Sequence, residues 1–148
     1  MENETYKHTQ MGWTTSIAVF VPLLICLGAI FTVPDEVAEV RNVLIAVAVI
    51  LAIVLLLFFT LTVRVNATHI QVAFGPGLIR RTITRADIES IEAVRNKWWY
   101  GFGIRYVPSG GWMFNTSGLD AVQLVFKNGK RFRIGTDDPE GLVTALRN

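Results

Sequence analysis

The sequence predicts a membrane-anchored α+β protein in which two transmembrane helices form a hairpin and a small β-rich domain follows them. Three observations predict this fold class. Apolar residues make up 51% of the 148 residues and are concentrated in two uncharged runs near the N-terminus. After the second run, apolar and polar residues alternate, which is typical of half-buried strands. The C-terminal residues carry one apolar stripe at helical spacing, so a helix should close the domain.

The two apolar runs, 13–33 and 43–63, contain no Asp, Glu, Lys, Arg or His over 21 residues each. As helices they would reach about 31 Å, which matches a bilayer hydrocarbon core of about 30 Å. Buried helices of soluble proteins rarely remain uncharged on every face for so long. A cleaved signal peptide fits the first run poorly, because a second span follows at once. We therefore expect a transmembrane hairpin over residues 13–63.

Charge predicts the orientation of this hairpin. The short linker 34–42 holds three acidic residues against the single Arg41, whereas Arg64 and further arginines follow the second span. Positive residues favour the cytoplasmic side of a membrane. We expect a cell-membrane protein with an external linker, a cytoplasmic tail over residues 1–12 and a cytoplasmic domain over residues 64–148.

The first half of the domain predicts a strand hairpin. Residues 69–74 alternate cleanly, Gly75-Pro76-Gly77 is a turn, and residues 78–83 can return as the partner strand. Residues 87–94 are expected to form a further strand, although the spacing of Ile88 and Ile91 also allows a short helical turn.

The second half predicts another hairpin, with strands over 121–126 and 131–134 joined by a turn at Asn128-Gly129. Alternation leaves Arg131 and Arg133 on the face opposite the core. The residues expected on the buried face are Val122, Leu124, Phe126, Phe132 and Ile134.

The C-terminal helix is expected to begin at Asp137, a good N-cap with Glu140 three residues later and Pro139 in the first turn. Its apolar stripe should cover the open sheet and consists of Leu142, Val143, Ala145 and Leu146.

Basic residues supply one set of candidate binding residues. Residues 64–148 hold twelve Lys and Arg against seven Asp and Glu, a balance of +5, while residues 1–63 hold two against five, a balance of −3. A basic surface beneath a membrane can attract anionic headgroups, but an ordinary bias of positive charge toward the cytoplasmic side explains the same balance. The candidate basic patch consists of Arg80, Arg81, Lys127, Lys130, Arg131 and Arg133.

Aromatic residues supply a second set. Trp98, Trp99 and Tyr100 follow Lys97, and tryptophan and tyrosine favour the headgroup level of a membrane. Core packing is the alternative for Trp98 and Trp99. Core packing is our expectation for Trp112 and Phe114.

An order of five to seven strands followed by one helix is that of a half-open barrel of the pleckstrin-homology (PH) type. Within residues 100–140, the segments Tyr100–Arg105, Trp112–Gly118, Ala121–Leu124 and Gly129–Glu140 sharpen this comparison. The chain resembles bacterial two-span membrane proteins with a PH-like domain, a largely uncharacterised group. The resemblance implies an antiparallel half-open barrel of about six or seven strands closed by one C-terminal helix, and it supplies no catalytic residues.

Catalysis finds little support in the sequence. His8 and His69 are the only histidines, and no Cys or carboxylate near either has metal-ligand spacing. The glycine clusters match neither a P-loop nor a dinucleotide fingerprint. We therefore expect no catalytic residues, no metal and no cofactor. Membrane tethering and the modest charge also argue against nucleic-acid binding.

Two binding functions remain. In the favoured one, the domain is a protein-interaction or assembly module, and small residues such as Gly28 and Ala48 could let the helices associate with themselves or with other membrane proteins. In the alternative, the basic patch binds anionic lipid of the inner leaflet. A membrane-bound enzyme is the weakest of the three hypotheses.

Overall fold

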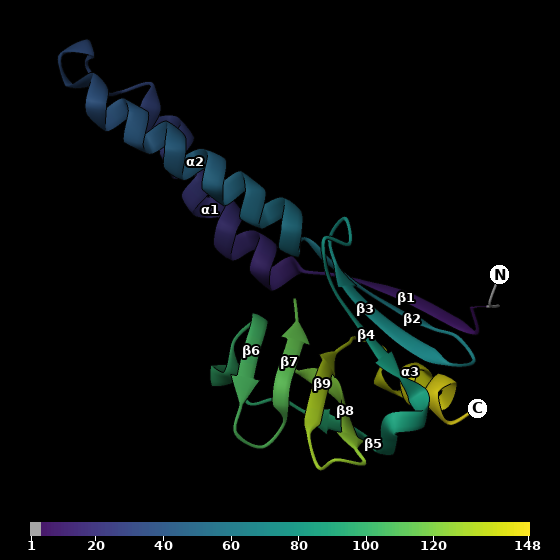
Figure 1. The fold of residues 1–148 in the computed structure, drawn as a ribbon. Coiled ribbons are helices and arrows are strands. Elements are labelled where there is room, and N and C mark those ends of the chain that lie inside the picture. Colours follow the sequence, from purple (N-terminus) through teal and green to yellow (C-terminus); the bar gives the residue numbers. More distant parts are fainter. Residues whose placement is uncertain (1–3) are drawn as a thin grey trace.

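The computed structural model describes residues 4–148 and has two parts, a helical hairpin and a unit of two sheets. Helices α1 (Trp13–Ile30) and α2 (Ala38–Phe58) lie side by side and project from the sheets (Figure 1). A single turn of 3₁₀ helix, η1 (Asp35–Val37), joins them. Both helices are long and apolar enough to cross a membrane. No residue of α1 is buried, and Ala48 is the one buried residue of α2.

Both helices end earlier in the chain than the apolar runs predict. The first run extends to residue 33, but α1 ends at Ile30. The second run extends to residue 63, but α2 ends at Phe58 and the chain continues as a strand from Thr60. Residues 60–63 are apolar or β-branched because they belong to a buried strand, and composition alone does not separate such a strand from the end of an apolar helix.

The first sheet is antiparallel, with strand order β1-β2-β3-β4. Its strands are β1 (Tyr6–Met11), β2 (Thr60–Val65), β3 (His69–Phe74) and β4 (Ile79–Thr84). The hairpin of β3 and β4 agrees closely with the sequence prediction. Strand β1 does not, because the sequence assigned residues 1–12 to a tail. The helical hairpin is thus inserted between two paired strands of one sheet.

The second sheet has strand order β5-β8-β9-β7-β6. Its strands are β5 (Ile88–Arg95), β6 (Gly103–Val107), β7 (Gly111–Asn115), β8 (Asp120–Phe126) and β9 (Arg131–Gly135). All its pairs are antiparallel except β7 with β9, which is parallel. Residues 4–148 therefore form nine strands in two sheets that do not close into a barrel, instead of the six or seven strands of a half-open barrel.

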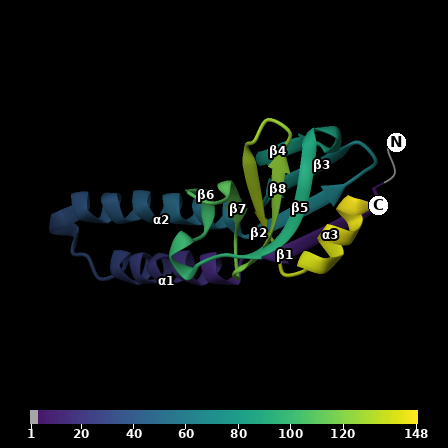
Figure 2. The same ribbon diagram turned by 90° about the horizontal axis from the view of Figure 1, so that it is seen from below.

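Helix α3 (Pro139–Arg147) ends the chain, on the side of the sheets remote from the hairpin (Figure 2). Its N-cap is Asp138, whose carboxylate accepts a hydrogen bond from the backbone N–H of Gly141 at 3.0 Å. The predicted N-cap, Asp137, instead lies 2.5 Å from His8 of β1. Leu142 and Leu146 are the buried residues of the helix.

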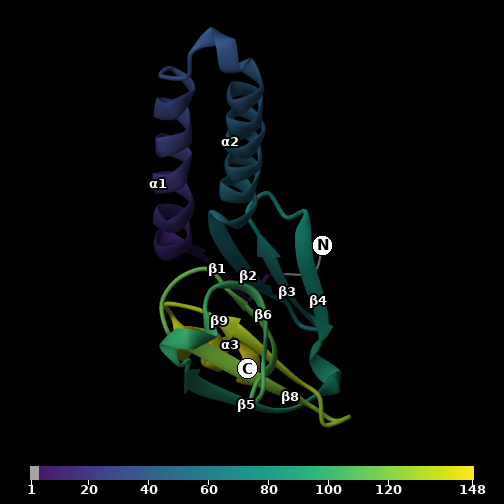
Figure 3. The ribbon, with the colours of Figure 1, turned by 90° about the vertical axis from the view of Figure 1, so that its left-hand side faces the viewer.

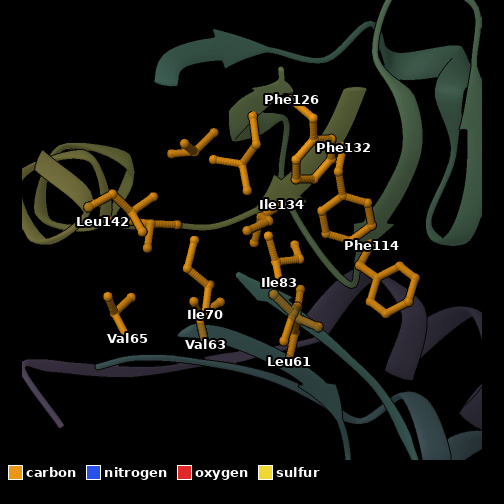
Figure 4. Close-up of a cluster of buried hydrophobic side chains, with 14 of the residues drawn as sticks. Leu61, Val63, Val65, Ile70, Ile83, Phe114, Phe126, Phe132, Ile134 and Leu142 are labelled. Atoms are coloured by element: carbon orange, nitrogen blue, oxygen red, sulfur yellow. The ribbon is translucent and has the colours of Figure 1, made fainter. Parts of the chain in front are cut away.

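The core lies between the two sheets and α3 (Figure 4). The five residues predicted for the buried face of β8 and β9 are all buried. The hairpin contributes to the same core, because the Phe58 ring at the end of α2 packs edge-on against Phe74, with 5.0 Å between ring centroids.

Hydrogen bonds also tie the base of the hairpin to the second sheet, directly below the helices in Figure 3. The Thr116 hydroxyl donates to the Phe58 carbonyl at 2.7 Å, and the Thr15 hydroxyl donates to the Thr116 carbonyl at 2.6 Å. The Gln10 amide donates to the Ser117 carbonyl at 2.6 Å. The loop after β7 is thus fixed to both helices and to β1.

Candidate functional site

Half of the predicted basic patch, namely Lys127, Lys130 and Arg131, lies at the end of the second sheet that is remote from the helices. The turn between β8 and β9 carries Lys127 and Lys130, and it points away from α1 and α2 in both Figure 1 and Figure 3. The opposite end of β9 reaches Gly135, which packs against Asn115 beside the base of the hairpin. Because β9 has five residues, the basic turn lies about 17 Å from this contact, measured along the strand.

Three of the predicted basic residues gather around one groove, where β4 faces β7 and β9 across the open side between the sheets. The groove has a volume of about 640 Å³ and two aromatic side chains in its wall. We call it the distal basic groove and define it by Arg81, Lys130, Arg131, Tyr106 and Trp112.

Arg81 points toward the core side of β4, and its guanidinium lies 4.4 Å from the centroid of the Phe132 ring. Partial burial lowers the pKa of Arg81, since a charge withdrawn from water is less well solvated. Four ion pairs occur among residues 4–148, and neither Arg81, Lys130 nor Arg131 takes part in them. Three cations without a paired carboxylate make this groove suited to binding an anion.

Lys127 lies beside the groove rather than in it. It lines a neighbouring hollow of about 380 Å³ together with Arg81 and Lys130. Asp87 lines the same hollow and supplies one negative charge there. Within the groove itself, Arg131 donates to the Ser109 carbonyl at 2.9 Å, which holds its side chain across the mouth.

Tyr106 and Trp112 form the aromatic wall of the groove. They come from paired positions on β6 and β7, and their rings meet edge-on at 5.7 Å between centroids. Tyr106 is 66% exposed and Trp112 is 50% exposed. Trp112 was expected in the core together with Phe114, and only Phe114 is buried. Trp112 and Phe114 lie on the same face of β7, but the two sheets do not cover that face at the Trp112 end of the strand.

Arg80 and Arg133 do not join the groove. Arg80 is exposed on the opposite face of β4 from Arg81, because neighbouring residues of a strand point to opposite faces. Arg133 is only 5% exposed and donates to the side-chain carbonyls of Asn96 and Gln123. Burial lowers the pKa of Arg133, and the positive charge of Arg131 adds to this effect.

Arg133 instead holds the loop that carries the predicted interfacial aromatics. This loop contains η3 (Trp98–Tyr100), a single 3₁₀ turn between β5 and β6. The Arg133 guanidinium lies 6.0 Å from the centroid of the Tyr100 ring and bonds to Asn96 at the start of the loop. Trp98 and Trp99 point outward and are 75% and 60% exposed, so neither packs in the core.

The sequence did not identify Tyr106 and Trp112 as members of the site. The alternation of Tyr106 with Val107 could have indicated that Tyr106 is exposed on a strand. The sequence could not show that β6 and β7 face β4 across a groove, because this depends on contacts between distant segments. No group of three or more His, Cys, Asp or Glu that could hold a metal occurs among the residues described.

Comparison with known proteins places this chain in no family. No protein-family model matches it, and no curated protein matches it.

Proposed function

We propose that this protein is a non-catalytic membrane protein whose sheet domain binds a protein partner through the distal basic groove. The observation that carries the proposal is the position of the groove, which opens at the end of the domain remote from the helices. An anionic segment of a soluble protein, or of a neighbouring membrane protein, could reach three cations and two aromatic rings there.

Membrane insertion is the first part of this proposal. The 18 residues of α1 and the 21 residues of α2 would span about 27 and 31 Å as helices. Their apolar side chains are exposed along their length, which would be costly in water and is favourable in lipid. The acidic linker and the basic domain favour an orientation with both termini in the cytoplasm. The order of sheets followed by one helix also supports a PH-like identity for the domain.

The position of the charges favours a protein partner over lipid of the inner leaflet. Electrostatic attraction between exposed charges decays over a Debye length of about 8 Å at physiological salt. The basic turn lies at the far end of β9, about 17 Å along the strand from the end that packs beside the hairpin. Anionic headgroups would therefore attract Lys127 and Lys130 only weakly.

Site-specific photo-crosslinking in living cells tests the binding partner. A photoreactive amino acid at Trp112 or Lys130 should give a discrete protein adduct, and the same group at exposed Glu89 on β5 should not. Changing Arg81 and Arg131 together to Ala should reduce the adduct at least tenfold. Adducts of phospholipid mass would favour the lipid alternative, and an adduct that the double change leaves unaltered would refute a role for the groove.

Reporter fusions test the orientation independently. A reporter active only outside the cytoplasm should be active within the linker Asp35–Glu39 and inactive at the C-terminus. The reverse pattern would contradict the proposed cytoplasmic domain.

A further inference from the structure

A second groove lies between the helical hairpin and the segment that follows the exposed tryptophans. It has a volume of about 510 Å³, within the usual range of about 300–1,000 Å³ for ligand pockets. The helices contribute Thr14, Thr15, Ala18, Val19, Val54 and Phe58. The domain contributes the segment 101–105, which ends in Arg105. We call this the juxtamembrane groove.

The helix residues give the depth of this groove relative to a membrane. Val19 is the seventh residue of α1, so the groove extends about 9 Å along the helix from its first residue. On the other helix it extends from Phe58, the last residue of α2, back to Val54. If α1 spans the bilayer, one end of the groove lies at the headgroup boundary and the other among the acyl chains.

The residues before the groove match a headgroup environment. Trp98 and Trp99 are exposed, and the Lys97 ammonium lies 5.1 Å from the centroid of the Trp99 ring. The turn η3 that carries these tryptophans immediately precedes the segment 101–105, which lines the groove together with both helices. An exposed tryptophan pair beside a lysine is a typical arrangement at the boundary between lipid and water.

Arg105 supplies a charge at the end of the groove. Its Nε–H donates to the Phe102 carbonyl at 3.0 Å, which folds the guanidinium back over Gly101. Among residues 4–148 it takes part in none of the four ion pairs. The terminal guanidinium nitrogens have the geometry to donate two parallel hydrogen bonds to a phosphate group.

We propose that the juxtamembrane groove binds one phospholipid of the surrounding bilayer, with an acyl chain along α1 and α2 and the phosphodiester at Arg105. Apolar walls that continue the lipid-facing surface of the helices suit an acyl chain, and a single cation at the membrane boundary suits the headgroup. The proposal rests on the membrane insertion proposed above. A bound lipid would fill the space between domain and hairpin.

Native mass spectrometry of the full chain tests the site, with the protein reconstituted with palmitoyl-oleoyl-phosphatidylglycerol and then transferred to detergent. The unmodified protein should retain one lipid per chain. Ala18→Trp, which fills the groove, and Arg105→Ala, which removes the charge, should each reduce the retained fraction at least tenfold. Ala52→Trp on α2 and Arg80→Ala on β4 lie outside the groove and should retain the lipid.

Failure of the site and failure of insertion are distinguishable. Absence of retained lipid in the unmodified protein, or equal retention in all four variants, would overturn the lipid site while the protein remains in membranes after an alkaline wash. Release of the unmodified protein by the same wash would overturn insertion itself. Because Arg105 is exposed, Arg105→Ala should leave the melting temperature unchanged, so a loss of lipid in that variant is not a loss of fold.

Discussion

Met11 and Thr60 lie opposite each other in the β1–β2 ladder, and the two helices enter and leave the sheet next to them. The ladder continues one step further, where the Gly12 backbone N–H donates to the Phe59 carbonyl at 2.8 Å. Helices α1 and α2 therefore take the place of the turn in an antiparallel strand pair. This connection makes β1 part of the sheet domain although 48 residues separate Met11 from Thr60 along the chain.

Deletion of residues 1–10 should strongly destabilise the sheet domain. It removes almost all of β1 and leaves β2 as an unpaired edge, with the loss of several backbone hydrogen bonds at about 1 kcal/mol each. We expect the free energy of unfolding to fall by about 3 kcal/mol or more, measured by thermal melting in detergent. Adding a peptide of residues 4–12 should restore part of the stability. Unchanged melting of the shortened chain would contradict a structural role for β1.

Gly12→Ala should destabilise the junction between the hairpin and the second sheet. A Cβ at this position would collide with the Thr116 hydroxyl and lie 2.9 Å from the Phe58 carbonyl oxygen. Overpacking of this kind costs about 1–3 kcal/mol, which melting should detect. Gly28→Ala is the matched control within α1, because a Cβ there meets nothing within 4 Å. The control should be neutral or slightly stabilising, since alanine favours a helix by about 1 kcal/mol over glycine.

Arg133→Leu should loosen the loop that carries Trp98 and Trp99. The change removes two hydrogen bonds from a buried cation to Asn96 and Gln123, and bonds to charged groups contribute about 1.5–3 kcal/mol each. We expect a fall in melting temperature and faster tryptic cleavage after Lys97. Arg95→Leu removes an exposed pair with Asp120, which contributes at most about 1 kcal/mol. Equal effects of the two changes would mean that Arg133 does not hold the loop.

Tyr6 should make stability depend on alkaline pH. Burial, followed by the hydrogen bond of its hydroxyl to Asp138 at 3.0 Å, raises the pKa of Tyr6 well above its ordinary value of about 10. A raised pKa in the folded state stabilises the protein fully below the unfolded pKa, and this contribution is lost as pH rises above it. The difference in melting temperature between the unmodified protein and Tyr6→Phe should be constant up to about pH 9 and shrink above pH 10.

The matched control is Tyr106→Phe, which removes a hydroxyl that is exposed in the wall of the distal basic groove. At pH 8 its melting temperature should equal that of the unmodified protein, so a lower melting temperature of Tyr6→Phe at that pH reports the loss of the bond to Asp138. A Tyr6→Phe difference that stays constant from pH 9 to pH 11 would contradict the stabilising role of the Tyr6 proton.

Patterns within a few neighbouring residues correctly predicted the elements whose formation depends on those residues alone. The alternation of His69–Phe74 gave the bounds of β3, and the Asn128-Gly129 turn placed the hairpin of β8 and β9. The two apolar helices followed from length and composition. Each of these elements is specified by side-chain periodicity or by turn residues within a few positions.

The elements that the sequence missed depend on contacts between distant segments. Strand β1 carries few apolar residues, because Tyr6 and His8 contact Asp138 and Asp137 near the other end of the chain. Alternation correctly put Arg133 on the face opposite Phe132, but it could not show that the loop before β6 covers that face. For such reasons only three of the six predicted basic residues, Arg81, Lys130 and Arg131, lie around one groove between the two sheets.

The insertion of the hairpin between β1 and β2 would also give the sheet a role during biosynthesis, if the hairpin crosses a membrane as proposed. Strand β1 is made before α1 and α2, and its partner β2 is made after them. A chain in which only one of the two helices crosses would hold the strands on opposite sides of the membrane, where they cannot pair. Pairing of β1 with β2 would therefore be a built-in check on insertion: a chain with one helix outside the bilayer would expose the edge of β2 to chaperones and proteases.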